Sequence, residues 1–145
     1  MQITRYTDYS LRVLIYLGLK ENEQVTIQEI ADAYQISKNH LMKIVQELNL
    51  QGYVLAVRGK NGGLKLNQSP KDINVGKLVR LMEQDTKLVE CFSQKNTCVI
   101  TPHCQLKRIF SGALESFYLY LESYTLADLL GKKENEGLSE ILLKG

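Results

Sequence analysis

The chain has 145 residues, 44% of them hydrophobic, and a formal net charge of +2. This length suits one domain, with or without an oligomerisation arm, and the composition is not that of a disordered chain. The N-terminus lacks the basic-then-apolar pattern of a signal peptide. The longest apolar run, at 13–19, is far shorter than the roughly 20 residues that a membrane helix needs. We therefore predict a cytoplasmic protein that has no membrane partner.

The N-terminal third of the sequence has the pattern of a helix-turn-helix. Apolar residues recur at three- and four-residue steps over 7–21, which predicts an amphipathic helix with Thr7 as its N-cap. A second helix is predicted from Thr26, because Thr26 and Glu29 have the spacing of a capping box. Ser37 then caps a third helix, which carries polar and basic residues early. Two short helices joined in this way are typical of a DNA-binding motif.

A predicted β-hairpin follows directly after the third helix. The segments 53–58 and 64–67 have the composition of strands, and the glycine-rich turn between them supplies the positive φ angles that a tight hairpin needs. A hairpin in this place is a wing. The predicted fold class is therefore mainly α: a winged helix-turn-helix DNA-binding domain over residues 1–84, with a long C-terminal dimerisation helix.

The C-terminal half is predicted to hold that long helix. After a fourth helix and a cysteine-containing loop over 85–100, Thr101-Pro102 opens a helix that runs to about Tyr124, within a dimerisation region over 101–130. Its apolar residues are spaced 4, 3, 4, 3, 4, as in a coiled-coil seam, beside a second apolar stripe. A single wide core face is the alternative. We predict that the homodimer interface contains Leu106, Phe110, Ala113, Phe117, Tyr120 and Tyr124. Residues 131–145 are predicted to be a polar linker and tail, open to disorder, without an assigned role.

The helix-turn-helix and wing make one stretch of the chain locally basic. Residues 37–65 carry five basic side chains and one acid, the footprint of a local anionic partner. Each basic residue alone is more typical of a solvated surface, and it is the combination that predicts double-stranded DNA. A dimer would place its recognition helices roughly 34 Å apart, so we expect an inverted-repeat operator. The predicted DNA-binding residues are Thr26, Ser37, Lys38, Asn39, His40, Lys43, Arg58, Lys60, Asn61, Gly62 and Gly63, the two glycines permitting close approach to the duplex.

All three cysteines, Cys91, Cys98 and Cys104, lie within fourteen residues. Their C-x6-C-x5-C spacing lacks the close pairs that are usual for zinc. Iron–sulfur clusters are held by thiolates and accept a non-cysteine fourth ligand. The pattern favours a cluster and leaves three alternatives open: a thiol redox switch, zinc, and unliganded cysteines.

Taken together, these segments resemble a known family. The N-terminal MQITRYTDYSLRVLIYL, the helix-turn-helix, the wing RGKNGGLKL, the segment INVGKLVRLME and the three-cysteine loop are similar to the dimeric winged-helix iron–sulfur repressors of the IscR and NsrR type. The resemblance covers about residues 1–130 and is greatest to the nitric-oxide-sensing members.

The resemblance implies a set of cluster ligands. Cys91, Cys98 and Cys104 match the three cysteine ligands of the family. IscR-like members take the fourth from a His three residues after the last cysteine, but this chain has Lys107 there, which cannot serve while it is protonated.

Nitric-oxide-sensing members instead use an Asp early in the first helix of the other subunit. Asp8 occupies that position, and Arg12 matches a family Arg that pairs with it. Without the resemblance, Asp8 is explained by the dipole of the first helix. His103 remains a rival fourth ligand.

The function that the resemblance implies is a homodimeric, cluster-dependent transcriptional repressor that releases DNA when nitric oxide attacks the cluster. A 4Fe-4S cluster is favoured over 2Fe-2S. The alternatives are a thiol-redox repressor without a cluster and an iron–sulfur status regulator. An enzyme or electron carrier is disfavoured, because the sequence holds no P-loop, G-x-S-x-G, H-E-x-x-H or dinucleotide fingerprint.

Overall fold

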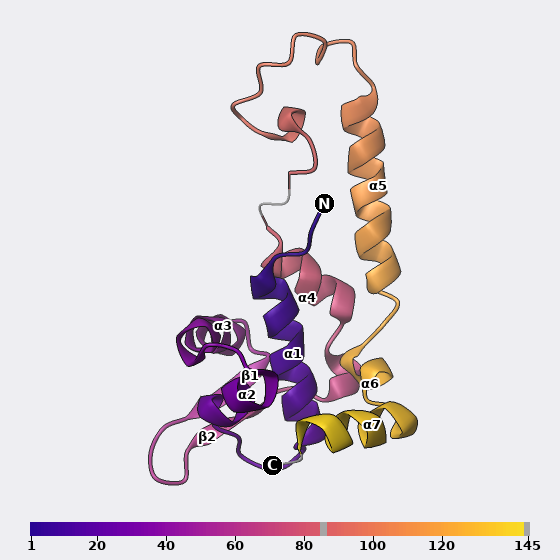
Figure 1. Cartoon of the computed structure of the whole chain (residues 1–145). Coiled ribbons are helices and arrows are strands. Elements are labelled where there is room, and N and C mark those ends of the chain that lie inside the picture. The colour runs from indigo at the N-terminus through magenta and orange to yellow at the C-terminus, as the bar shows by residue number, and fades with distance from the viewer. Residues whose placement is uncertain (85–86, 144–145) are drawn as a thin grey trace.

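The computed structural model describes residues 1–84 and 87–143 (Figure 1). Short 3-10 turns occur at Pro70–Asp72 and Glu90–Phe92. The helices and strands, in chain order, are α1 (Arg5–Leu19), α2 (Ile27–Tyr34), α3 (Lys38–Leu50), β1 (Val54–Val57), β2 (Gly63–Leu66), α4 (Val75–Met82), α5 (Leu106–Leu121), α6 (Leu126–Leu129) and α7 (Lys132–Leu142).

The main core forms where the apolar faces of α1, α2 and α3 meet. Its fully buried side chains include Leu14 of α1, Ile30 of α2 and Ile44 of α3. Burying an aliphatic side chain of this size stabilises the fold by about 1.5–3 kcal/mol. The predicted caps of the helix-turn-helix are present, since the side chains of Thr26 and Ser37 each accept a hydrogen bond from the first turn of their helices.

The first helix begins earlier than the sequence predicted. Its N-cap is Thr4, whose side chain accepts a hydrogen bond from the N–H of Thr7. Thr7, the predicted cap, is instead fully buried inside the first turn. The helix also ends two residues before the predicted boundary, at Leu19. Both Thr4 and Thr7 have the side-chain chemistry of a cap, and tertiary contacts decide between them.

The wing follows α3 through a tight backbone turn. Gly52 has a φ of +82°, the N–H of Gly52 donates to the carbonyl of Asn49, and the N–H of Tyr53 donates to the carbonyl of Leu48. This pair of bonds is a Schellman motif, which favours glycine at that position. β1 and β2 pair antiparallel, with Val54 opposite Leu66. The mainly helical fold with a two-stranded wing confirms the predicted fold class.

The long helix α5 begins at Leu106, five residues after the predicted start at Thr101. Proline at a first helical position permits a helix but does not require one. Here the Thr101 hydroxyl donates to the carbonyl of Cys98, and backbone turns hold 98–104 in the loop. The helix ends at Leu121, before the predicted end at Tyr124.

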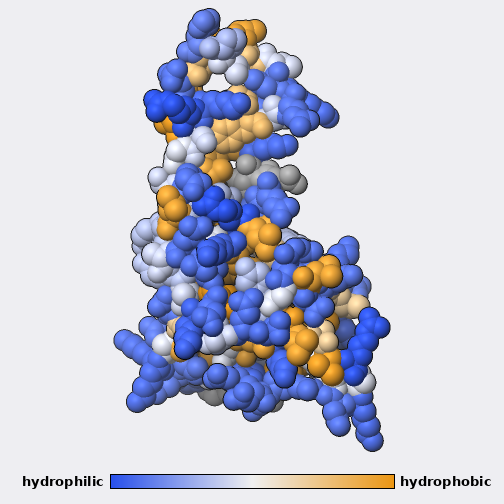
Figure 2. Space-filling model, turned by 180° about the vertical axis from the view of Figure 1, so that it is seen from behind, coloured by the Kyte–Doolittle hydropathy of each residue, from blue (hydrophilic) through white to orange (hydrophobic). Residues whose placement is uncertain are grey.

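Only part of α5 packs on the rest of the chain. Tyr118 is its one buried residue, and it packs with Val75 and Val79 of α4. In Figure 1 the other half of α5 extends past the start of α1 toward the cysteine loop. Figure 2 shows apolar side chains at the surface of this upper part of the molecule. A single chain therefore leaves much of the apolar surface of α5 uncovered.

The C-terminal end of α5 is joined to the start of α4 through backbone groups. The N–H of Val75 donates to the carbonyl of Tyr124 at 3.0 Å, and the Asn74 side chain donates to the carbonyl of Glu122 at 2.7 Å. Gly76 lies directly against the Glu122 backbone, where a Cβ atom would overlap it. These contacts fix the direction in which α5 leaves the domain.

The C-terminal tail is a helix, which corrects the expectation of a polar linker open to disorder. α7 covers Lys132–Leu142, and Leu142 and Leu143 pack against the main core. The polar residues that suggested a linker form the outer face of an amphipathic helix, whose inner face contains Asn135, Leu138 and Leu142. None of the helices in the described part of the chain is long and apolar enough to cross a bilayer.

We expect Gly76→Ala to lower the free energy of unfolding by about 1–3 kcal/mol, because the new methyl group meets backbone that cannot move aside. The matched control is Gly137→Ala in α7, where a Cβ meets nothing within 4 Å. That change should stabilise the protein by about 0.5–1 kcal/mol. Urea unfolding of both variants measures the difference, and a neutral Gly76→Ala would contradict the close approach.

Candidate metal centre and nucleic-acid interface

The three cysteines line one small cavity between the loop and the start of α5. Its volume is about 150 Å³, and its walls include Ile100 and Phe110 as well as Cys91, Cys98 and Cys104. All three are free thiols, and Cys98 is exposed. Within residues 1–84 and 87–143, no three His, Cys, Asp or Glu side chains converge closely enough to hold a single metal ion. The thiols therefore share a cavity and do not converge on one point, and such a set of soft ligands fits an iron–sulfur cluster.

Hydrogen bonds within the loop join the residues that directly precede the first two cysteines. One oxygen of Glu90 accepts from the backbone N–H of Thr97 at 2.9 Å and from its hydroxyl at 2.8 Å. These bonds hold the pKa of the Glu90 carboxyl below its usual value. The sequence analysis did not identify Glu90. The sequence does show that Glu90 directly precedes Cys91 and that Thr97 directly precedes Cys98.

A second set of bonds joins the loop to the turn before α5. The side chain of Asn96 accepts from the N–H of Cys98 at 3.0 Å and donates to the Thr101 hydroxyl at 2.8 Å. The N–H of Leu106 approaches the sulfur of Cys104 at 3.4 Å. Hydrogen bonds to thiolate sulfur are among the groups that tune a bound cluster.

The two non-cysteine candidates near the loop lie differently. Lys107 lines the cavity, at the position where the IscR-like members would have histidine. His103 is exposed and is not among the described residues that line the cavity. The structure therefore brings Lys107, but not His103, to the three thiols.

Asp8 and Arg12 form the pair that the resemblance implied. The guanidinium of Arg12 donates to both oxygens of Asp8, at 2.9 and 3.1 Å. Both side chains remain 41–45% exposed, so the carboxylate lies at the surface of α1. Arg12 also lies over the rings of Tyr9 and Tyr34, at 5.3 and 5.9 Å from their centroids. Burial raises the pKa of Tyr34 to about 12.

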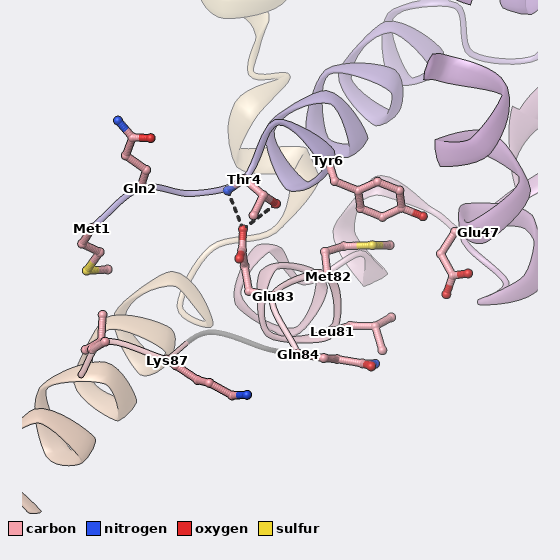
Figure 3. Close-up of a pocket in the computed structure, with 11 residues that line it drawn as sticks. Met1, Gln2, Thr4, Tyr6, Glu47, Leu81, Met82, Glu83, Gln84 and Lys87 are labelled. Atoms are coloured by element: carbon pink, nitrogen blue, oxygen red, sulfur yellow. Dashed lines mark hydrogen bonds between the residues drawn. The ribbon is translucent and has the colours of Figure 1, made fainter. Parts of the chain in front are cut away.

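The start of α1, which carries Asp8, is fastened to the end of α4. One oxygen of Glu83 accepts from the N–H of Thr4 at 2.7 Å, from its hydroxyl at 2.9 Å and from the hydroxyl of Thr7 at 2.8 Å. Figure 3 shows the Thr4 bonds at the edge of a cavity of about 660 Å³ that Tyr6 and Lys87 also line. A carboxylate here also favours the helix dipole. Glu83 thus fixes the first turn of α1 against the chain that leads to the cysteine loop.

The recognition helix α3 presents most of its predicted DNA-binding residues to solvent. Lys38, Asn39 and Lys43 are exposed on its outer face. His40 differs from the expectation, because it is half-buried with its ring edge-on to Tyr9 at 5.1 Å. Met42 is 49% exposed on the outer face and was not predicted, since sequence reasoning assigns methionine to cores.

The wing presents Arg58, Lys60 and Asn61 to solvent. The expected reason for its glycines was close approach to DNA, but the structure supplies an internal one. A Cβ at Gly62 would overlap the carbonyl of Val57, and a Cβ at Gly63 would crowd Gln24 and Val25. Gly62 is needed to close the turn itself, whereas Gly63 lets the wing lie close to residues 24 and 25.

Two links fix the wing to the helical core. The N–H of Leu64 and the carbonyl of Leu64 both bond to the backbone of Val25. On the other strand, the side-chain oxygen of Asn49 accepts from the N–H of Ala56 at 3.1 Å. Asn49 lies near the end of α3, so it couples the wing to the recognition helix.

Most of the predicted dimer seam lies at the surface of the single chain. Leu106, Tyr120 and Tyr124 are 52%, 66% and 41% exposed, and Phe110 is 37% exposed. Phe117 is the exception, since it packs beside Tyr118 in the small cluster between α4 and α5.

Comparison with known proteins assigns the chain to a family. The Rrf2 family, described as iron-dependent transcriptional regulators, matches residues 3–132. The chain belongs to the Rrf2 family. The HTH-type transcriptional regulator NsrR of Bacillus licheniformis is 49% identical over 137 residues, which cover 93% of this chain and 96% of that one.

Two solved Rrf2-like structures agree with this assignment. T. potens IscR has a TM-score of 0.74 at 25% identity and covers 94% of this chain and 90% of its own. CymR, the global cysteine regulator of B. subtilis, has a TM-score of 0.65 at 26% identity and covers 89% of this chain and 95% of its own. This Rrf2 protein is thus a DNA-binding transcriptional repressor and not an enzyme.

We expect Asn49→Ala to speed amide hydrogen exchange at Ala56 by roughly fivefold, the effect of losing about 1 kcal/mol of local stability. Exchange at Leu64, which bonds to Val25, should not change. Gln46→Ala, one turn earlier on α3 and also exposed, is the control. Equal exchange at Ala56 in all three proteins would show that Asn49 does not hold the wing.

Proposed function

We propose that this protein is a cytoplasmic, iron–sulfur-cluster-dependent repressor that binds inverted-repeat operators as a homodimer and releases DNA when nitric oxide attacks the cluster. The observation that carries the proposal is the single cavity that all three free thiols line. The NsrR relatives and the family description of iron dependence point the same way. The proposed cytoplasmic location follows from the proposed partner, which is chromosomal DNA.

Cys91, Cys98 and Cys104 would hold the cluster, with Asp8 of the second subunit as the fourth ligand. We favour 4Fe-4S over 2Fe-2S. A carboxylate is a harder ligand than a thiolate, so it is the poorer match to a soft iron–sulfur centre. When bound, the cluster supplies iron that is reactive toward nitric oxide at this weakly held corner. The exposure of Asp8 in the single chain leaves it accessible to a second subunit.

The contacts of Asp8 suggest how its engagement would reach DNA. Asp8 is paired with Arg12, which lies over Tyr9 and Tyr34. Tyr9 in turn contacts His40, in the first turn of the recognition helix. Holding Asp8 would therefore restrain α1 and, through these rings, the position of α3. Releasing Asp8 would remove that restraint, as in other two-state switches.

The exposed seam of α5 supports a homodimer, because a second copy would cover the apolar residues that one chain leaves in water. Lys38 and Lys43 would hold phosphates, and Asn39 has the donor and acceptor pair that reads adenine. Arg58 and Lys60 would reach the backbone or minor groove from the wing.

A thiol-redox repressor without a cluster is the second candidate, and the same three free thiols favour it. Anaerobic purification separates the two. A brown protein with iron and acid-labile sulfide supports the cluster, whereas a colourless protein that responds to diamide supports a disulfide switch. An iron–sulfur status regulator would carry the cluster and keep its operator occupied under nitric oxide.

We expect nitric oxide, titrated into anaerobic cluster-loaded protein, to abolish operator binding in step with loss of the cluster absorbance. A thousandfold loss of affinity takes only about 4 kcal/mol, which misplacing one half-site can supply. Asp8→Ala should alter the absorbance and weaken operator binding before any nitric oxide is added. Asp72→Ala, an exposed acid on a different surface, is the control. Operator binding that survives loss of the cluster would refute the switch.

We expect Lys43→Ala to weaken binding to all DNA sequences alike and to reduce the slope of log affinity against log salt by about 2, because the homodimer loses one phosphate contact in each subunit. Lys43→Arg keeps the charge and should keep the slope. Lys133→Ala removes an exposed charge on α7 and should leave the slope unchanged. An unchanged slope for Lys43→Ala would exclude it from the DNA-binding surface.

A further inference from the structure

Glu90 and Thr97 close the loop between the first two cysteines. Each of these residues directly precedes a cysteine, and both donors of Thr97 converge on one oxygen of Glu90, at 2.9 and 2.8 Å. The bonds join the residue before Cys91 to the residue before Cys98. We call this pair the loop clip.

The loop clip uses a kind of hydrogen bond that is suited to an exposed loop. A carboxylate acceptor forms shorter and stronger hydrogen bonds than a neutral one, and the two bonds from Thr97 to Glu90 are 2.9 and 2.8 Å long. The clip also offsets the conformational entropy that is lost when the two ends of the loop are brought together. It therefore limits how far the Cys91 and Cys98 thiols can separate when nothing is bound between them.

The third thiol is joined to the clipped segment by a different residue. Asn96, beside Thr97, bonds to Cys98 and to Thr101. Thr101 in turn donates to the carbonyl of Cys98 at 2.9 Å. The turn that carries Cys104 is thus tied to the segment that the clip closes. All of these bonds form in the bare polypeptide.

We propose that Glu90 is a positioning residue that keeps the thiols gathered around their cavity both before a cluster enters and after it leaves. This rests on the proposed function only in taking the three thiols as cluster ligands. Glu90 also lines the cavity, but the oxygen that forms the clip already accepts two hydrogen bonds, and its part is to shape the loop. The metal-free protein then keeps a formed site, so that recovery after nitric oxide depends on cluster supply and not on refolding of the loop.

The test compares Glu90→Ala with Glu90→Gln in metal-free, anaerobic protein. Both variants lose the negative charge, but only glutamine keeps an oxygen that can accept from Thr97. Two quantities are measured: amide hydrogen exchange at Thr97, and affinity for Cd²⁺, a thiol-seeking probe ion. Gln94→Ala, exposed in the same loop, is the control.

In Glu90→Ala we expect exchange at Thr97 to become about tenfold faster and Cd²⁺ affinity to fall about tenfold. Glu90→Gln should stay within about threefold of the wild type, and Gln94→Ala should not differ from it. Equal values for the alanine and glutamine variants would overturn the proposal. If the clip effect appears but the wild-type protein takes up no cluster, the proposed function fails while the clip stands.

Discussion

The meeting of three thiols around one cavity is the constraint on which the rest of this structure depends. Cys91 and Cys98 lie in a loop, whereas Cys104 lies in the turn that precedes α5. Thr101 and its neighbours hold that turn outside the helix. The later start of α5 is thus part of the site, because it leaves Cys104 in the turn that lines the cavity.

The sequence predicted the helix-turn-helix and wing well because local signals decide them. Caps such as Thr26 and Ser37, and the glycine at Gly52, act within a few residues and leave a readable pattern. The start of α1 was wrong because Thr4 and Thr7 are equivalent locally. Thr4 is the N-cap, and Glu83, distant in sequence, accepts hydrogen bonds from its N–H and its hydroxyl. Periodicity in the tail was hidden by its polar residues, although Leu142 reaches the core.

The chemistry of the candidate site could be predicted from the sequence, but the hydrogen bonds that hold the loop and the wing in place could not. Cysteine spacing and the position of Asp8 are visible in the sequence, and so is the pairing of Asp8 with Arg12 once the resemblance is considered. Glu90 and Asn49 were missed because a lone acid or amide in a polar segment carries no signal until its partner is known. His40 and Gly62 were assigned to DNA, but the first also packs on Tyr9 and the second also closes the turn of the wing.

The hydrogen bonds between the C-terminal end of α5 and the start of α4 have a mechanical consequence. The bonds of Val75 and Asn74 hold one end of α5, and Gly76 lies in close contact with the Glu122 backbone there. The other end follows the cysteine loop and extends away from the helix-turn-helix (Figure 1). A helix of 16 residues is about 24 Å long, so a tilt of about 5° at its pivot displaces the far end by roughly 2 Å. α5 is therefore arranged as a lever. A small rearrangement beside α4 becomes a movement comparable to a bond length near the thiols, and a movement near the thiols becomes a small rearrangement beside α4.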